Sequence, residues 1–150
     1  MSQLARGEHL AFLIHDAQKR LRHEFTRRVA ALELTPATAR GLAFLSARAG
    51  SSLRALADAL EVQPMSMVRV IDDLEARGLL RREIDPRDRR AHCLYLTPAG
   101  ERVVDSIWII LDEIISDACG ELRTAETNAL RNGLKSFIAG IQRIQQSESK

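Results

Sequence analysis

The stretch LLRREIDPRDRRAHCLYLT, from Leu79 to Thr97, decides the fold of this chain. It holds two short β-prone runs on either side of an arginine-rich turn, and it follows a helical segment that ends at Gly78. Asp85 and Pro86 begin the turn, because proline fixes its own φ and pushes the preceding residue into an extended conformation. The pattern predicts a β-hairpin attached to a helix-turn-helix, which is the arrangement of a winged helix.

The tip of the predicted wing carries three guanidinium groups, those of Arg87, Arg89 and Arg90. Arginine keeps its charge, is less strongly hydrated than lysine, and is attracted to the negative potential of a narrow DNA minor groove. Asp88 lies on the same side of an extended segment as Arg90, so we expect it to orient that guanidinium. The sequence therefore predicts double-stranded DNA as the partner; the alternative interpretation is a solvated polar hairpin that binds nothing.

Length and composition restrict the class of protein. The 150 residues are 45% hydrophobic, which is enough for one domain with a core. No stretch reaches the roughly 18 to 20 apolar residues that span a bilayer, and the first residues lack the apolar centre of a signal peptide. Cys93 and Cys119 have neither metal-ligand spacing nor the pattern of a disulfide framework. We expect a cytoplasmic protein with no metal, no other cofactor and no membrane partner.

The formal net charge is only +2, so the positions of the charges matter more than their sum. Basic residues gather around the predicted wing: Arg77, Arg81, Arg82, Arg87, Arg89 and Arg90. Acidic residues lie on the preceding helical segments: Asp58, Glu61, Asp72, Asp73 and Glu75. They would oppose binding if they faced phosphates, so DNA binding requires most of them to point away.

Apolar spacing and start signals predict helices on both sides of the hairpin. They cover His9 to about Leu32, Pro36 to a stop near Gly50, about Leu53–Leu60, Pro64 to the cap at Gly78, Pro98 to the break at Gly120, and about Thr124–Gln146. The hairpin strands are expected at about 79–84 and 91–96. Thr35–Pro36 and Thr97–Pro98 mark helix starts, because threonine caps a helix and proline fits its first turn.

The long helices near the two ends of the chain carry more apolar surface than a helix-turn-helix needs. The last one is predicted to bury Leu130, Leu134, Phe137, Ile138, Ile141 and Ile144. Apolar burial is worth about 25 cal/mol per Å², so such stripes can hold an obligate dimer together. The sequence predicts a homodimer; the alternative is that these helices cover one another within a single chain.

The helix that begins at Pro64 is the predicted recognition helix, since its first residues would enter the major groove. The residues there are Met65, Ser66 and Arg69. Arg69 is the candidate for reading a base, because a guanidinium reaches both O6 and N7 of guanine. The alternative is an ordinary surface arginine paired with Asp72 or Asp73. Two further residues are expected to contact the sugar-phosphate backbone: Gln63 and Arg54.

These segments resemble the MarR-type winged-helix transcription regulators, and within them the SlyA-like members. The resemblance rests on Leu53–Ala57, Val68–Leu80, Asp85–Arg90 and Leu96–Gly100, and it extends over nearly the whole chain. It implies a mainly α fold with a small β-wing, in a single domain of residues 1–150. Residues 8–33 and 101–146 would be dimerisation helices, and residues 34–100 the DNA-binding lobe. It further implies a homodimer that reads pseudo-palindromic operators, with half-sites about one helical turn, ~34 Å, apart.

The resemblance also implies roles for single residues. Arg90 matches the family's minor-groove arginine, Asp88 matches its partner, and Arg69 matches the recognition-helix arginine of SlyA-like members. Family members often bind small aromatic carboxylates or phenols between the dimer helices and the winged lobe. Such a ligand weakens DNA binding by favouring a different spacing of the two recognition helices, as expected for a repressor. Four residues are then candidates for that pocket: His15, Arg22, Arg40 and Trp108. The alternatives are solvated side chains for His15 and Arg22 and a core position for Trp108.

Three other functions are alternatives to DNA binding. A redox-responsive regulator of the same fold would use Cys93, beside His92, whereas the simpler interpretation is a buried or half-buried strand residue. A winged-helix module for protein contacts alone would not need Arg69 or Arg90. An enzyme would need a catalytic constellation, and the sequence has no glycine-rich phosphate loop, nucleophile elbow or metal-ligand spacing of histidines. The sequence therefore predicts a protein that is not an enzyme.

Overall fold

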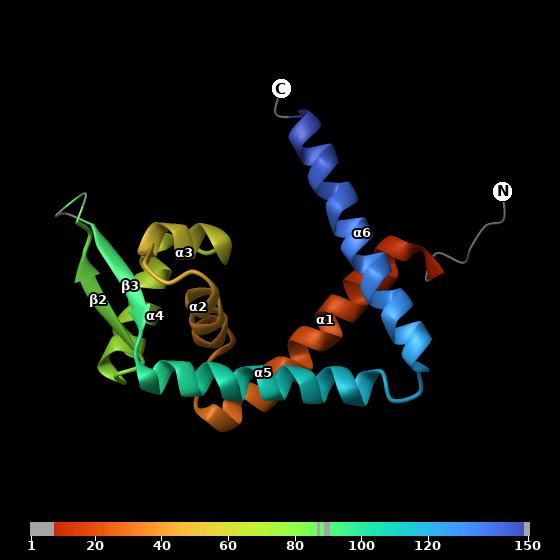
Figure 1. The fold of residues 1–150 in the computed structure, drawn as a ribbon, viewed down its shortest axis with the longest axis horizontal. Coiled ribbons are helices and arrows are strands. Elements are labelled where there is room, and N and C mark those ends of the chain that lie inside the picture. The colour runs from red at the N-terminus through yellow and green to blue at the C-terminus, as the bar shows by residue number, and fades with distance from the viewer. Residues whose placement is uncertain (1–7, 87, 89–90, 149–150) are drawn as a thin grey trace. The chain divides into compact units, whose positions relative to one another are not determined.

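The computed structural model describes residues 8–86, 88 and 91–148. Its helices are α1 (Leu10–Val29), α2 (Pro36–Ala47), α3 (Leu53–Ala59), α4 (Pro64–Ala76), α5 (Pro98–Ala118) and α6 (Thr124–Glu148), with a short 3-10 helix, η2 (Ala30–Leu32), after α1. Its strands are β1 (Ser51–Ser52), β2 (Leu80–Ile84) and β3 (His92–Leu96) (Figure 1). The chain divides into two compact units, Met1–Ile114 and Ile115–Lys150.

The helices of the first unit begin where side chains cap them. Thr35, Ser52 and Thr97 each accept a hydrogen bond from the backbone N–H three residues ahead, at 3.1 to 3.2 Å. These bonds satisfy donors that the first helical turn leaves without a partner. Helix α4 instead begins with Pro64 after Gln63, whose side chain makes no capping hydrogen bond. The predicted starts of α2, α4 and α5 are therefore confirmed.

The core of the first unit joins the helices to the sheet. Its largest fully buried side chains include Leu42, Leu45, Leu56, Met67, Ile71, Leu74, Leu80, Leu94 and Ile107. On α4, the buried residues Met67, Ile71 and Leu74 recur at helical spacing. Because this face is buried, the opposite face of α4 is held toward solvent. Figure 1 shows α2, α3 and α4 gathered beside the β2–β3 hairpin.

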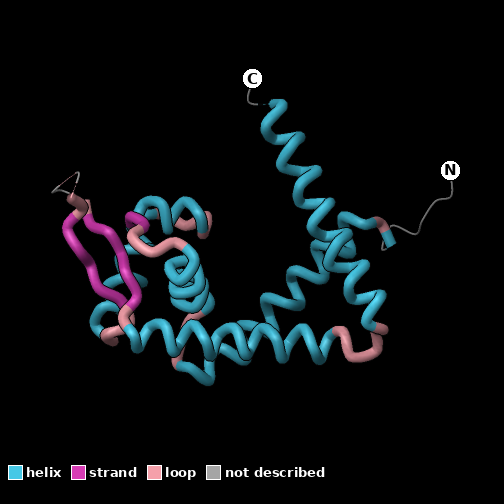
Figure 2. Tube along the Cα trace, in the orientation of Figure 1, coloured by secondary structure: helices cyan, strands magenta, loops and turns pink. Residues whose placement is uncertain are grey.

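The three strands form one antiparallel sheet in the order β1–β3–β2. Leu80 pairs with Leu96, and Ile84 pairs with His92. The two hairpin strands therefore begin within one residue of the predicted starts at 79 and 91 and end at the predicted residues 84 and 96. Strand β1 was not predicted from the sequence. Its Ser51 pairs with Leu94 of β3. Figure 2 shows the strands in magenta against the helices of the same unit. The mainly α-helical winged-helix fold with a small β-wing is thus confirmed.

The second unit carries an apolar face that its own residues do not cover. Six apolar side chains of α6 that were predicted to be buried are 39 to 55% exposed: Leu130, Leu134, Phe137, Ile138, Ile141 and Ile144. That prediction is wrong for the single chain, because this unit holds little besides one long helix. On α1, Leu10, Phe12 and Leu13 are likewise more than half exposed. Within the described ranges, no helix is both long and apolar enough to cross a membrane.

Candidate DNA-binding surface

Helices α3 and α4 pack against each other and form the helix-turn-helix. In the turn between them, Glu61 takes the left-handed conformation with φ of 54°, and the N–H of Val62 donates to the carbonyl of Ala57 at 3.0 Å. This turn leads the chain into Pro64, so the first residues of α4 lie at an exposed end of the helix. Three predicted contact residues are exposed there: Met65, which is 78% exposed, Ser66 and Arg69.

Arg69 is exposed, and no hydrogen bond or ion pair within the described residues involves its guanidinium. The alternative that it pairs with an aspartate of its own helix is wrong. Asp73 instead lies 3.7 Å from Arg77, and Asp72 lies 2.5 Å from Arg82. Because both aspartates have other cationic partners, Arg69 keeps the donors that a guanine edge requires.

The acidic residues near the predicted DNA-binding surface, which would oppose binding if they faced phosphates, mostly lie beside arginines. Asp72, Asp73 and Glu75 have the partners Arg82 and Arg77, and Asp58 lies 4.0 Å from the Nε atom of Arg54. Of the five, Glu61 is the one without such an arginine among the residues that the structure describes. The side chain of Arg54 is 87% exposed and only loosely paired, so it remains free to approach phosphate. Gln63 is also exposed, at the start of α4.

The hairpin is closed near its turn by two backbone hydrogen bonds. The N–H of Asp85 donates to the carbonyl of Ala91 at 3.0 Å, and the N–H of Ala91 donates to the carbonyl of Asp88 at 2.9 Å. Asp88 is exposed. The predicted minor-groove residues Arg87, Arg89 and Arg90 lie outside the described residues, and so does the expected contact between Asp88 and Arg90.

Three arginines that the sequence analysis counted around the wing have partners within the protein. The guanidinium of Arg77 donates to the carbonyl of Glu33 at 3.0 Å, which ties the end of α4 to the segment before α2. Arg81 donates to the carbonyl of Leu96 at 3.0 Å and lies 5.2 Å from the centre of the Tyr95 ring. Arg82 donates to two carboxylates of α4. A count of charges does not reveal these roles, because they depend on how the segments pack: Arg77 bonds to the segment before α2, Arg81 to β3, and Arg82 to α4.

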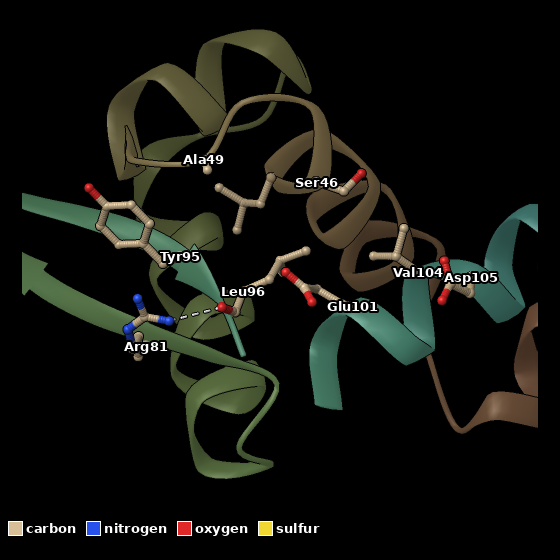
Figure 3. Close-up of a pocket in the computed structure, with 9 residues that line it drawn as sticks. Ser46, Ala49, Arg81, Tyr95, Leu96, Glu101, Val104 and Asp105 are labelled. Atoms are coloured by element: carbon tan, nitrogen blue, oxygen red, sulfur yellow. Dashed lines mark hydrogen bonds between the residues drawn. The ribbon is translucent and has the colours of Figure 1, made fainter. Parts of the chain in front are cut away.

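A cavity of about 500 Å³ lies beside Arg81 and Tyr95, between α2, the sheet and the start of α5 (Figure 3). Figure 3 shows the hydrogen bond of Arg81 to Leu96, and Glu101 and Asp105 on the α5 side of the cavity. With two carboxylates in its lining and its arginine already bonded, this cavity does not suit an acidic ligand. None of the four predicted effector residues lines it.

The four predicted effector residues lie on three helices of the first unit. His15 and Arg22 are exposed on α1, Arg40 is exposed on α2, and Trp108 on α5 is 51% exposed. The alternative of a core position for Trp108 is therefore wrong. Arg22 lines a hollow of about 710 Å³ along α1, together with Asp16, Lys19, Arg20, His23, Glu24 and Thr26. The structure does not bring His15, Arg40 or Trp108 into this hollow.

Ion pairs on α1 compensate the two carboxylates and one of the arginines that line that hollow. The carboxylate of Glu24 accepts hydrogen bonds from Arg27 and Arg28, which lower its pKa to about 2. Hydrogen bonding to Arg20 likewise lowers the pKa of Asp16. Both carboxylates are ionised at neutral pH and partnered. The cations of the hollow outside these pairs are Lys19 and Arg22, so its uncompensated charge is positive.

Cys93 lies on β3, half-buried, where its register partners are Ser52 on β1 and Glu83 on β2. This is the half-buried strand position of the simpler interpretation. Cys93 and Cys119 form no disulfide. Across the described ranges, no group of three or more histidine, cysteine, aspartate or glutamate residues is placed to hold a metal ion.

Comparison with known proteins agrees with this geometry. Residues 32–91, from the end of η2 through β2 to the residue before β3, match the MarR family. The chain is 32% identical over 127 residues to the putative transcriptional regulatory protein for the hcr operon of Thauera aromatica, covering 84% of this chain and 76% of that protein.

Solved structures give the same result. The transcriptional repressor CouR, bound to a 23-mer DNA duplex, is 32% identical with a TM-score of 0.73, covering 94% of this chain and 99% of CouR. Wild-type apo MarR from E. coli has the same fold, with a TM-score of 0.80 at 22% identity, covering 85% of this chain and 95% of MarR. With its fold and its sequence in agreement, the chain belongs to the MarR family of winged helix-turn-helix transcription regulators.

Proposed function

We propose that this protein regulates transcription by binding double-stranded DNA in a sequence-specific manner, with α4 in the major groove and the wing in the flanking minor groove. The observation that carries the proposal is the free Arg69 guanidinium on the exposed face of α4, next to aspartates that other arginines already hold. The relative CouR was solved with a DNA duplex, which supports the same use of the fold here. The SlyA-like assignment stays a prediction.

The protein acts as a homodimer in this proposal. The apolar faces of α1 and α6 are exposed on the single chain, and a second copy would remove them from water. Residues 8–33 and 101–146 then serve as dimerisation helices, and residues 34–100 as the DNA-binding lobe. Two-fold pairing presents two recognition helices, so the operator is an inverted repeat with half-sites about 34 Å apart.

A small aromatic or phenolic acid is the proposed effector. The hollow along α1 supports this, because Lys19 and Arg22 leave it with uncompensated positive charge. The test is titration of salicylate against operator-bound protein. We expect wild type to release DNA and Arg22→Ala to resist. Unchanged operator affinity of the wild-type protein across the titration would show that the effector proposal is wrong.

The two remaining candidates predict different behaviour. A module for protein contacts would bind DNA weakly and without sequence preference, whatever residue stands at position 69. A redox-responsive regulator would lose operator affinity after peroxide treatment, and Cys93→Ser would abolish that response. The exposed, free guanidinium of Arg69 is the observation that favours direct DNA reading over both.

Selection of bound duplexes from a pool of random DNA tests the proposed function. The purified full-length protein is expected to enrich an inverted repeat with half-sites one helical turn apart. We expect the protein to act in the cytoplasm, on matching sites that lie upstream of genes. A pool that shows no enriched sequence after repeated rounds, at a salt concentration where the protein still binds, would contradict sequence-specific recognition.

A further inference from the structure

We propose that Arg82 is a positioning residue for DNA binding: it holds the wing against the recognition helix and keeps two carboxylates of that helix away from the DNA contacts. The inference rests on the proposed function. The Nη1 atom of Arg82 donates to Oε2 of Glu75 at 2.5 Å, and its Nη2 atom donates to Oδ1 of Asp72 at 2.5 Å. One guanidinium on β2 therefore holds two acids on α4.

The geometry of this contact suits arginine in particular. The two nitrogens of the fork reach separate carboxylates, which a lysine ammonium cannot do with the same directionality. The Arg82 side chain is only 26% exposed, so water and salt screen the contact less than they screen a surface pair. Asp72 and Glu75 are three residues apart on α4, so the contact fixes a whole turn of the helix against the strand.

The neighbouring arginine makes none of these contacts. Side chains alternate across a strand, so Arg81 and Arg82 point to opposite faces of the sheet. Arg81 lies over the Tyr95 ring and pairs with Glu83 and the carbonyl of Leu96, all within the hairpin. Arg82 is thus the arginine of β2 that connects the hairpin to α4, and Arg81 serves as its matched control.

Arg82 also determines what Arg69 can bind. Asp72 lies three residues after Arg69 on α4, a spacing at which an arginine and an aspartate readily pair on a helix. In the structure, Asp72 is held by Arg82 and the Arg69 guanidinium is free. Removal of Arg82 would leave Asp72 and Glu75 as uncompensated negative charges, and Asp72 could then capture Arg69. The uncompensated charges and the capture of Arg69 would both lower the affinity for DNA. The capture of Arg69 would also remove discrimination between bases.

The test compares Arg82→Gln and Arg81→Gln with wild type, using full-length protein and the operator recovered by selection. Affinity is measured for that operator and for a scrambled duplex, together with the thermal midpoint and helix content. We expect Arg82→Gln to lose about tenfold or more in operator affinity and part of its discrimination, and Arg81→Gln to stay within about threefold of wild type.

A rescue variant separates positioning from a general loss of stability. In the triple variant Asp72→Asn, Glu75→Gln, Arg82→Gln, the carboxylates are gone, so Arg69 is free again and discrimination should return even though the wing contact is absent. If Arg82→Gln does not fold, Arg82→Lys replaces it, and we expect an intermediate loss because lysine holds one carboxylate at a time.

Each failure has a distinct meaning. If wild type does not discriminate the selected operator from the scrambled duplex, the proposed function is wrong. The positioning role alone is overturned if wild type discriminates the operator from the scrambled duplex and Arg82→Gln does so equally well with the same affinity. The same holds for Arg82→Lys where it replaces Arg82→Gln. The role is equally overturned if Arg81→Gln loses as much as Arg82→Gln, or if the triple variant folds without any recovery of discrimination.

Discussion

A Cβ atom on Gly100 would lie 2.0 Å from the backbone carbonyl oxygen of Leu79. The first turn of α5 therefore packs directly on the backbone that leads into β2. Thr97 completes this junction, because its N–H donates to the same Leu79 carbonyl at 3.1 Å and its hydroxyl donates to the carbonyl of Gly78 at 2.6 Å. The base of the wing, the end of the recognition helix and the start of α5 are held together at this point.

Gly100→Ala is expected to lower the free energy of unfolding by about 1 to 3 kcal/mol, because the added methyl group forces the α5 backbone away from Leu79. Urea unfolding followed by circular dichroism measures the change. Gly133→Ala on α6 is the control: a Cβ there meets nothing within 4 Å, and alanine favours the helix by roughly 0.5 to 1 kcal/mol. Equal stability of the two variants would contradict the packing described for Gly100.

Met65 is expected to read the methyl group of a thymine, because its apolar side chain is 78% exposed at the start of the recognition helix. Replacement of thymine by deoxyuridine removes only that methyl group. At one position of one half-site, the replacement should weaken wild-type binding by about fourfold, from about 0.8 kcal/mol per buried CH2 or methyl group. Met65→Ala should be insensitive to it, and Ser66→Ala should keep the wild-type response. A Met65→Ala variant that responds like wild type would exclude this contact.

Arg90→Ala is expected to weaken binding to most DNA sequences alike, because the predicted contact is with the minor groove and its potential rather than with one base. The slope of log affinity against log salt concentration should become shallower by about one per Arg90 removed, and a dimer contains two of them. Fluorescence anisotropy across a salt series measures both quantities. Arg102→Ala, on the exposed side of α5, is the control with the same loss of charge. Equal effects of the two substitutions would show that net charge alone matters.

Leu134→Glu is expected to shift the protein from dimer to monomer, because this residue of α6 is 42% exposed on the single chain and would be buried by a second copy. Burial of one leucine is worth about 1.5 to 3 kcal/mol, and a dimer contains two of them. Sedimentation equilibrium measures the association constant. Asn132→Glu, on the opposite side of the same helix, should remain dimeric. A wild-type protein that sediments as a monomer at micromolar concentration would contradict the proposed dimer.

Local signals were enough for much of this fold. A threonine followed by proline marks the starts of α2 and α5, and an Asp-Pro pair between two β-prone runs marks the hairpin, because these residues act on the backbone beside them. The spacing of Met67, Ile71 and Leu74 gave the buried face of α4 for a similar reason. Strand β1 could not be found this way, since two residues are too few to show a period.

The rest depends on contacts between distant parts of the chain. Arg77 bonds to a carbonyl 44 residues away, and Arg82 bonds to acids 7 and 10 residues away, so a count of charges near the wing overestimated what is available to DNA. Trp108 was misjudged because four apolar residues in a row, Ile107 to Ile110, mark no single face of α5. The apolar stripe of α6 was recognised, but periodicity does not tell an interior face from one that a partner covers.

The central claim is that Arg69, free on the exposed face of α4, reads a base of the operator. Selection from random DNA, carried out in parallel with wild type and Arg69→Ala, tests it most directly. We predict the same inverted repeat from both proteins, with one guanine per half-site strongly enriched by wild type and lost with the variant, at a cost of about 1 to 3 kcal/mol in affinity for each half-site. Identical base preferences at every position for the two proteins would contradict the claim.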